Sequence, residues 1–280
     1  MSARTVKSLL ADAAAMFDSD SALLDAQLLL GKIIGKDRSW MYAHDDADVT
    51  ETQAAAFRLL AERRSAGEPV AYLLGSRGFW RQHLDVSPSV LIPRPETELL
   101  VELVLQLELG LGVQVADLGT GSGAIALALA SEKPDWQIFA TDISKAALEV
   151  AQGNARKLGL DNVCFCEGDW FAALPSLKFN LIVSNPPYIA AGDPHLARGD
   201  VRFEPAGALI AGDEGMADLV HIAEQARLFL KSRGWLVMEH GFDQGREVRK
   251  LLETMGYSKI STHFDHNAKE RVTMGAWHAG

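Results

Sequence analysis

The chain has 280 residues and a mass of 30.4 kDa, a length that accommodates one large domain or two unequal ones. Hydrophobic residues make up 48%, and the longest uninterrupted apolar run, Ala124–Ala130, is far shorter than the roughly 18 residues of a membrane span. Acidic residues outnumber basic ones by 37 to 27, for a formal net charge of −10. This balance argues against a protein that holds nucleic acid mainly through phosphate contacts.

The first 75 residues predict helices only. Apolar residues recur at steps of three and four from Leu23 to Ile33, and a second helical pattern runs from about Glu51 to Arg64. The second pattern stops before Gly67 and Pro69, which are typical of a helix end. The region has 8 basic and 11 acidic residues, so it offers no basic surface to nucleic acid. We expect either a small helical bundle or a helical cap on the neighbouring domain.

A different texture follows, in which apolar residues alternate with Gly, Ser and Pro from Gly75 to Pro95 and predict a β-hairpin linker. Beyond it, strand and helix patterns alternate. The predicted strands are Val113–Leu118, Gln137–Thr141, Val163–Cys166, Phe179–Ser184 and Trp235–Glu239. The predicted helices are Glu96–Leu107, Ala124–Ser131, Ser144–Leu158, Gly215–Leu230 and Arg246–Met255. This order is typical of a parallel, Rossmann-like α/β sheet with helices on both faces.

The last two predicted strands, Tyr257–Phe264 and Arg271–Trp277, have only a loop between them and predict an antiparallel hairpin at the sheet edge. The predicted organisation is a helical domain over residues 1–75, a linker over 76–94 and an α/β domain over 95–280.

Two features bear on cellular location. The apolar stretch near the amino terminus is interrupted at Asp12, so no export signal is expected. The two cysteines, Cys164 and Cys166, point the same way in a strand and make an unlikely disulfide, so we interpret them as small core residues. Both observations favour a cytoplasmic protein. The eight histidines show no spacing typical of a metal site.

A glycine-rich segment, Asp117-Leu-Gly-Thr-Gly-Ser-Gly-Ala124, ends the first strand of the α/β region and opens a helix. Glycines here let the backbone approach a ligand that a side chain would block. Asp142 ends the second strand, where a carboxylate can accept both hydroxyls of a ribose. The pattern predicts a nucleoside site without naming the nucleoside, because Gly119, Gly121 and Ala124 also fit a dinucleotide fingerprint.

Two further motifs follow the third and fourth strands. After the third, Asp169 can receive an adenine amino group and Trp170 can offer an aromatic face. After the fourth comes Ser184-Asn-Pro-Pro-Tyr188. Its prolines fix the backbone and remove two N–H donors, so acceptors predominate. With a side-chain carbonyl from Asn185 and a flat wall from Tyr188, this pocket suits a planar NH2 group. Positioning alone can lower the barrier to methylation of such a nitrogen by roughly 7–11 kcal/mol.

With these motifs, the chain resembles class I S-adenosylmethionine-dependent methyltransferases of amino groups, and specifically the HemK family of protein-(glutamine-N5) methyltransferases of peptide-chain release factors. Further segments that carry the resemblance are Glu68–Gly75, Leu91–Glu98, Gly199–Pro205, Glu239–Gly241 and Glu270–Thr273. The resemblance covers nearly the whole chain and is weakest over the first 60 or so residues. Ser122 in place of a threonine is a mild departure from the motif.

The resemblance implies that the methyl donor is S-adenosylmethionine and the substrate is the glutamine of the Gly-Gly-Gln loop of class I release factors. It implies donor contacts by Gly119, Thr120, Gly121, Ser122, Gly123, Asp142, Trp170 and Asn185. Asn185 and the Pro186 carbonyl would bind the substrate NH2, with Pro187 and Tyr188 packed around it, which makes Asn185, Pro186 and Tyr188 the predicted catalytic residues. The helical domain would dock the rest of the release factor.

The residues by themselves leave other functions possible. An adenine-N6 DNA or RNA methyltransferase presents the same kind of NH2 group, but it needs a basic groove and a recognition domain for the base. A nicotinamide-dependent dehydrogenase leaves the Asn-Pro-Pro-Tyr motif without a role, and a non-catalytic binding module does not require the intact donor motif. Arg94 is interpreted equally as a contact to the donor carboxylate or as half of a surface ion pair. His240 is interpreted as a structural residue in preference to one facing the site.

Overall fold

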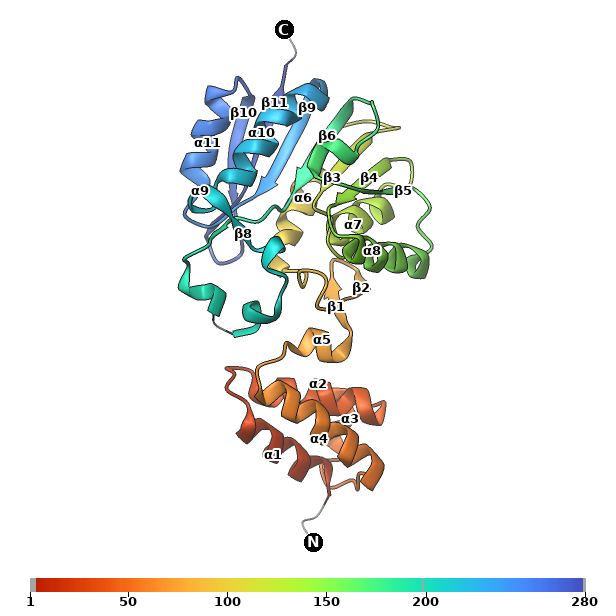
Figure 1. Cartoon of the computed structure of the whole chain (residues 1–280). Helices are drawn as coiled ribbons and strands as arrows, with labels where there is room; N and C mark the ends of the chain where they lie inside the picture. Colours follow the sequence, from red (N-terminus) through yellow and green to blue (C-terminus); the bar gives the residue numbers. More distant parts are fainter. Residues whose placement is uncertain (1–3, 198, 279–280) are drawn as a thin grey trace. The chain divides into compact units, whose positions relative to one another are not determined.

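The computed structural model describes residues 4–197 and 199–278, and its chain divides into two compact units (Figure 1). The first unit runs to Ser76 and also takes in the distant segment His195–Phe203. The second unit contains Arg77–Pro194 and Glu204 onwards.

The first unit is helical. Its helices are α1 (Val6–Met16), α2 (Ala22–Ile34), α3 (Arg38–Ala43), α4 (Glu51–Ser65) and α5 (Val70–Leu74). The two helices predicted here are confirmed as α2 and α4. At the start of α4, Thr50 and Gln53 form a capping box, and α2 ends at Gly35 in the left-handed conformation. Buried apolar residues such as Leu29, Leu30 and Phe57 form the core of this unit.

The segment His195–Phe203 joins the first unit through contacts at the end of α4. Arg64 donates to Asp200 Oδ1 at 2.9 Å, and Arg202 donates to the Ala66 carbonyl at 2.8 Å. A Cβ on Gly67 would lie 1.8 Å from Arg202 Nη2, so the side chain passes directly over a glycine. No local pattern indicates this arrangement, because the partners lie 136 residues apart in sequence.

A seven-stranded sheet forms the centre of the second unit in the described residues, with the order β10-β11-β9-β6-β3-β4-β5. The strands are β3 (Gln114–Leu118), β4 (Gln137–Asp142), β5 (Val163–Glu167), β6 (Phe179–Ser184), β9 (Leu230–Glu239), β10 (Ser258–Phe264) and β11 (Glu270–Trp277). The strands from β9 to β5 pair in parallel, whereas β11 is antiparallel to both β9 and β10. The predicted parallel sheet with an antiparallel carboxyl-terminal hairpin is confirmed.

Helices cover both faces of this sheet. On one face lie α6 (Glu98–Gln106), α7 (Ala124–Glu132) and α8 (Lys145–Leu158), and on the other α10 (Ala217–Phe229) and α11 (Gly245–Thr254). Successive strand residues alternate between the two cores, as Val115 and Ala116 do in β3. Both residues are fully buried, which explains why the central strands read as continuous apolar runs.

Smaller elements complete the second unit. The predicted hairpin is present as β1 (Ser76–Phe79) and β2 (Gln82–Asp85), which form a two-stranded sheet. Short strands β7 (Ile189–Ala190) and β8 (Ile210–Ala211) pair in parallel, and a short helix α9 (Gly212–Gly215) follows. None of the helices in the described residues is both long enough and apolar enough to cross a membrane.

The interpretation of the cysteines as core residues is wrong. Cys164 is exposed and Cys166 only half-buried, and both thiols are free. Their strand, β5, lies at the edge of the sheet, where one flank has no neighbouring strand from residues 4–197 or 199–278. Apolar character in an edge strand therefore does not report burial.

Candidate active site

The order of the strands fixes the position of the site. The chain leaves β3 toward β4 on one side, and β6 later returns to pair with the other side of β3. In such sheets ligands bind at the carboxyl ends of the strands, where the strand order reverses. The glycine-rich segment follows β3 and the Asn-Pro-Pro-Tyr motif follows β6, so the topology brings both motifs to this point.

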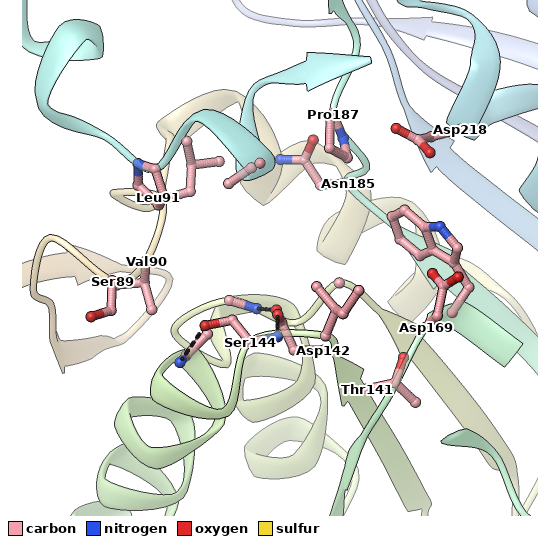
Figure 2. Close-up of a pocket in the computed structure, with 18 of the residues that line it drawn as sticks. Ser89, Val90, Leu91, Thr141, Asp142, Ser144, Asp169, Asn185, Pro187 and Asp218 are labelled. Atoms are coloured by element: carbon pink, nitrogen blue, oxygen red, sulfur yellow. Dashed lines mark hydrogen bonds between the residues drawn. The ribbon is translucent and has the colours of Figure 1, made fainter. Parts of the chain in front are cut away.

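A cavity of about 410 Å³ lies at this edge of the sheet (Figure 2). Of the predicted site residues, Gly119, Gly121, Asp142, Trp170, Asn185 and Pro187 line it. Asp169, which the sequence suggests as an adenine contact, lines it as well. Thr120, Ser122, Gly123, Pro186 and Tyr188 are not among the lining residues in the described part of the chain. Their direct contact with a ligand stays a prediction.

Asp117 holds the glycine-rich loop to the helix that follows it. Its Oδ2 accepts from the Thr120 hydroxyl at 2.6 Å and from the Ala126 N–H at 3.2 Å. Burial raises the pKa of the Asp117 carboxyl to about 7, against these hydrogen bonds. Thr120 thus supports the loop, and Gly123 lies so close to α7 that a Cβ would be 2.9 Å from Leu127 Cδ1.

Asp142 connects the loop to the second strand. Its Oδ2 accepts from the Gly121 N–H at 2.9 Å, and its Oδ1 accepts from the Ser144 N–H at 2.9 Å, as Figure 2 shows. Each oxygen keeps a further lone pair, and the residue lines the cavity. The carboxylate is therefore held rigidly in the position expected of a ribose acceptor.

Trp170 forms part of the wall close to the glycine-rich loop. A Cβ placed on Gly119 would lie 3.2 Å from its Cζ3, a tight contact, and the φ angle of +72° at this position also favours glycine. The φ angle of Trp170 is 42°, a strained value for an L-residue that surrounding contacts must maintain. Such strain is typical of functional sites.

Asp218, at the start of α10, is a lining residue that the sequence reasoning missed. Burial raises the pKa of Asp218, the charge of His221 lowers it, and the charge of Asp169 raises it. Among the described residues, the lining therefore contains three carboxyl groups, those of Asp142, Asp169 and Asp218, and no Lys, Arg or His. No motif marks Asp218, because only the packing of α10 brings it to the cavity.

Asn185 has a defined amide orientation. Its Nδ2 donates to the Thr97 hydroxyl at 3.1 Å, and no hydrogen bond to its Oδ1 is formed by the described residues. The carbonyl oxygen thus stays available as an acceptor. Tyr188 donates from its hydroxyl to Glu239 Oε1 at 3.3 Å, and burial raises the pKa of this phenol further above its ordinary value.

Arg94 forms an ion pair, so the pairing in the second of its two interpretations is confirmed, whereas the expected surface position of that pair is wrong. Its guanidinium donates to Glu204 Oε1 at 2.5 Å, while the Ile92 N–H donates to the other oxygen at 3.2 Å. The Glu204 side chain is fully buried, so the pair is no surface contact. This ion pair joins two loops of the cavity wall. The first loop contributes Ser89, Val90 and Leu91, and the second contributes Pro205, Gly207 and Ala208.

His240 is structural, as interpreted from the sequence. Its Nδ1 lies 2.8 Å from the Gly241 carbonyl and its Nε2 lies 2.8 Å from the Thr273 hydroxyl. Burial lowers the pKa of the imidazole. Both nitrogens are occupied by the protein, so neither is free for a ligand.

The lining fits S-adenosylmethionine. Fixed carboxylate oxygens suit a ribose, an aromatic wall suits an adenine, and carboxyl groups without cationic side chains suit a positively charged sulfonium. A Cβ at Gly121, which lines the cavity, would meet nothing within 4 Å, so there is open space next to this residue. The fold and the site together define a class I S-adenosylmethionine-dependent methyltransferase.

Comparisons with known proteins agree. Residues 110–273 match the family described as a methyltransferase domain, and residues 5–75 match the PrmC N-terminal domain. The chain is 49% identical over 266 residues to the release factor glutamine methyltransferase of Yersinia pestis, covering 95% of this chain and 96% of that protein. It is 48% identical over 260 residues to that of Escherichia coli (strain K12), covering 93% and 94%. The chain belongs to the release factor glutamine methyltransferase family.

Solved structures show the same fold at low sequence identity. A methyltransferase from Pyrococcus furiosus has a TM-score of 0.54 at 18% identity, covering 70% of this chain and 89% of its own. The T. thermophilus 16S rRNA methyltransferase RsmC, in complex with AdoMet and guanosine, has a TM-score of 0.54 at 21% identity, covering 72% and 49%. The likeness to these structures concerns the fold alone.

Proposed function

We propose that this protein transfers a methyl group from S-adenosylmethionine to the side-chain nitrogen, N5, of the glutamine in the Gly-Gly-Gln loop of class I peptide-chain release factors. The orientation of Asn185 carries the proposal. Because its NH2 is engaged by Thr97, its carbonyl oxygen is the atom left to accept a hydrogen from a substrate NH2.

The residues on the donor side of the cavity bind S-adenosylmethionine and orient it. Asp142 accepts the ribose hydroxyls, and Trp170 with Asp169 borders the adenine. The backbone of Gly119–Gly123 accommodates the methionine part, because positive φ angles at Gly119 and Gly121 let the loop curve around it. The bound donor supplies a methyl group on an already positive sulfonium.

The acceptor side presents the glutamine amide. Asn185 Oδ1 and the Pro186 carbonyl each accept one hydrogen of the substrate NH2, and Pro187 and Tyr188 pack around its plane. In the transfer the methyl–sulfur bond breaks, a methyl–nitrogen bond forms and the nitrogen loses a proton. A strong base is not needed beforehand, since the nitrogen becomes more acidic as it is alkylated. The protein contributes mainly alignment.

The partners and the location follow from this activity. Class I release factors are the protein substrates, the helical unit of residues 1–75 docks them, and no direct contact to nucleic acid or membrane is required. Since translation termination takes place in the cytoplasm, the protein acts there.

A single incubation tests the proposal. Purified protein is mixed with S-adenosylmethionine and unmodified release factor, and the product is mapped by peptide mass spectrometry with fragmentation. One added methyl group on the side-chain nitrogen of the loop glutamine is the expected result. Methylation at another residue, or none with a donor-binding protein, contradicts it.

The adenine-N6 methyltransferase alternative is not favoured. In the part of the chain that the structure describes, three carboxyl groups and no cationic side chain line the cavity, which is unlike a groove for nucleic-acid phosphates. The same incubation with DNA and RNA in place of the release factor should yield no methylated adenine.

A further inference from the structure

Glu239 is a buried carboxyl group next to the Asn-Pro-Pro-Tyr motif, without a role in the reaction as described so far. It ends β9, which pairs in parallel with β6 through Ser184 and Met238, so Glu239 and Asn185 leave neighbouring strands at the same edge. The residue is 1% exposed, and its Oε2 has no hydrogen-bond partner in the described residues. A carboxyl group kept in such a place at the cost of desolvation calls for an explanation.

Thr97 lies between Glu239 and Asn185. It precedes α6 at the N-cap position, where a threonine hydroxyl commonly accepts from the first backbone N–H groups, yet it makes no such bond. Its hydroxyl accepts from Asn185 Nδ2 at 3.1 Å and lies close enough to the Glu239 carboxyl to stabilise its charged form. This buried hydroxyl therefore serves the site and not its own helix.

A hydroxyl alone cannot select the orientation of an amide. It can accept from the amide NH2 or donate to the amide oxygen, and the two orientations differ by a half-turn of the Asn185 side chain. A carboxylate on the far side removes this ambiguity. When it takes the single hydroxyl hydrogen of Thr97, only lone pairs are left toward Asn185, and the NH2 group must face them.

We propose that Glu239 is a positioning residue that, through the hydroxyl of Thr97, fixes the amide of Asn185 with its carbonyl oxygen free for the substrate. The inference rests on the proposed methylation of a glutamine amide and assigns what orients its acceptor.

The charges around Glu239 make the arrangement sensitive to pH. Burial, with a smaller contribution from the charge of Glu96, raises the pKa of the Glu239 carboxyl to about 7. Hydrogen bonding from Thr97 and Tyr188 and the charge of Arg271 on β11 act in the opposite direction. Because the orienting form is the carboxylate, the turnover rate should fall as the pH drops through about 7.

Glu239→Gln removes the charge at nearly constant volume, and its amide can donate to Thr97, which turns the hydroxyl hydrogen toward Asn185. We expect kcat on release factor to fall roughly tenfold to a hundredfold, as for a misplaced reacting group, with little change in donor affinity measured by calorimetry. The fall in kcat below about pH 7 should also disappear. Glu247→Gln, an exposed position on α11, is the matched control with unchanged kcat and pH profile.

Thr97 supplies a second, independent pair of variants. Thr97→Val removes the hydroxyl and should lower kcat to a similar extent, whereas Thr97→Ser keeps it and should restore most of the activity. The double variant Thr97→Val/Glu239→Gln should have a kcat only slightly lower than either single variant, because both substitutions interrupt the same chain of interactions from Glu239 through Thr97 to Asn185. Circular dichroism verifies that each variant is folded.

The wild-type protein in the same assay separates the two proposals. If it does not methylate the release factor glutamine, the proposed function fails. If it does, the inference about Glu239 is overturned by a folded Glu239→Gln or Thr97→Val variant with wild-type kcat, by an unchanged pH profile in Glu239→Gln, or by fully additive effects.

Discussion

Asn185 is the side chain on which the proposed chemistry depends most. Asn185→Ala removes the acceptor oxygen and the bond to Thr97, so we expect kcat to fall roughly 100-fold or more through loss of alignment, with the thermal unfolding temperature nearly unchanged. Methyl transfer to the release factor is measured by mass spectrometry. Asn267→Ala, at an exposed loop position, is the matched control, and near-normal turnover of Asn185→Ala would refute the role.

Asp142 makes a contribution of a different kind, because it holds the donor and not the substrate. Asp142→Ala removes the oxygens that accept from Gly121 and Ser144 and that we assign to the ribose. Losing hydrogen bonds to a charged group costs about 1.5–3 kcal/mol, which predicts roughly 10- to 100-fold weaker binding of S-adenosylmethionine.

Isothermal titration calorimetry measures this affinity. Asp161→Ala, which removes an exposed carboxylate before β5, should bind the donor as the wild type does. An unchanged dissociation constant for Asp142→Ala counts against the ribose assignment.

A buried carboxyl group, that of Asp117, connects the end of β3 to the glycine-rich loop and to α7. Asp117 bonds the Thr120 hydroxyl and the Ala126 N–H, and burial raises its pKa from 3.8 in the unfolded chain to about 7. The folded state therefore binds a proton that the unfolded state has released between these values. Its contribution to the free energy of unfolding falls as the pH rises through this window and is constant above it.

Asp117→Asn keeps one acceptor oxygen and cannot titrate. We expect the stability of the wild type, relative to this variant, to decline from about pH 4 to about pH 7 and then to level off. Urea unfolding of both proteins across this range measures the difference in midpoint. A difference that is independent of pH contradicts the raised pKa.

The strands and helices around the site could be predicted because their signals are local. Ala124–Glu132 is apolar on every side and follows a glycine turn, so the sequence predicts a buried helix there, which is α7. The Asn185 motif likewise follows the segment predicted as the fourth strand, which is β6. The edge position of Cys164 could not be predicted from the sequence, because the neighbours of a strand are set by the order of the whole sheet. The partner of Arg94 was not readable either, because Glu204 lies 110 residues away.

The helical unit is where docking of the protein substrate can be tested. Deleting residues 1–75 should raise KM for intact release factor roughly tenfold or more, equivalent to at least about 1.4 kcal/mol of docking energy. Donor affinity should stay near the wild-type value, because the cavity-lining residues that the structure describes all belong to the second unit. Steady-state methylation and calorimetry provide the two measurements, and undiminished activity on intact factor rejects docking.

The segment His195–Phe203 requires its own control in that experiment. The deletion removes Arg64 and Ala66, to which Asp200 and Arg202 bind. Asp200→Asn weakens one of these contacts while leaving the helices in place. If this variant alone shows the same rise in KM, the loss belongs to the segment and not to the helical unit.

By itself the sequence determined the fold class, the family, the donor and the two motifs, because each is encoded by residues that are close together in the chain. Only the tertiary structure decided that Thr97 orients Asn185 from 88 residues away, that Arg94 pairs with Glu204, and that Asp218 reaches the cavity. It also placed Asp200 against Arg64. Such contacts depend on how strands are ordered and helices packed, and no local pattern of residues contains that information.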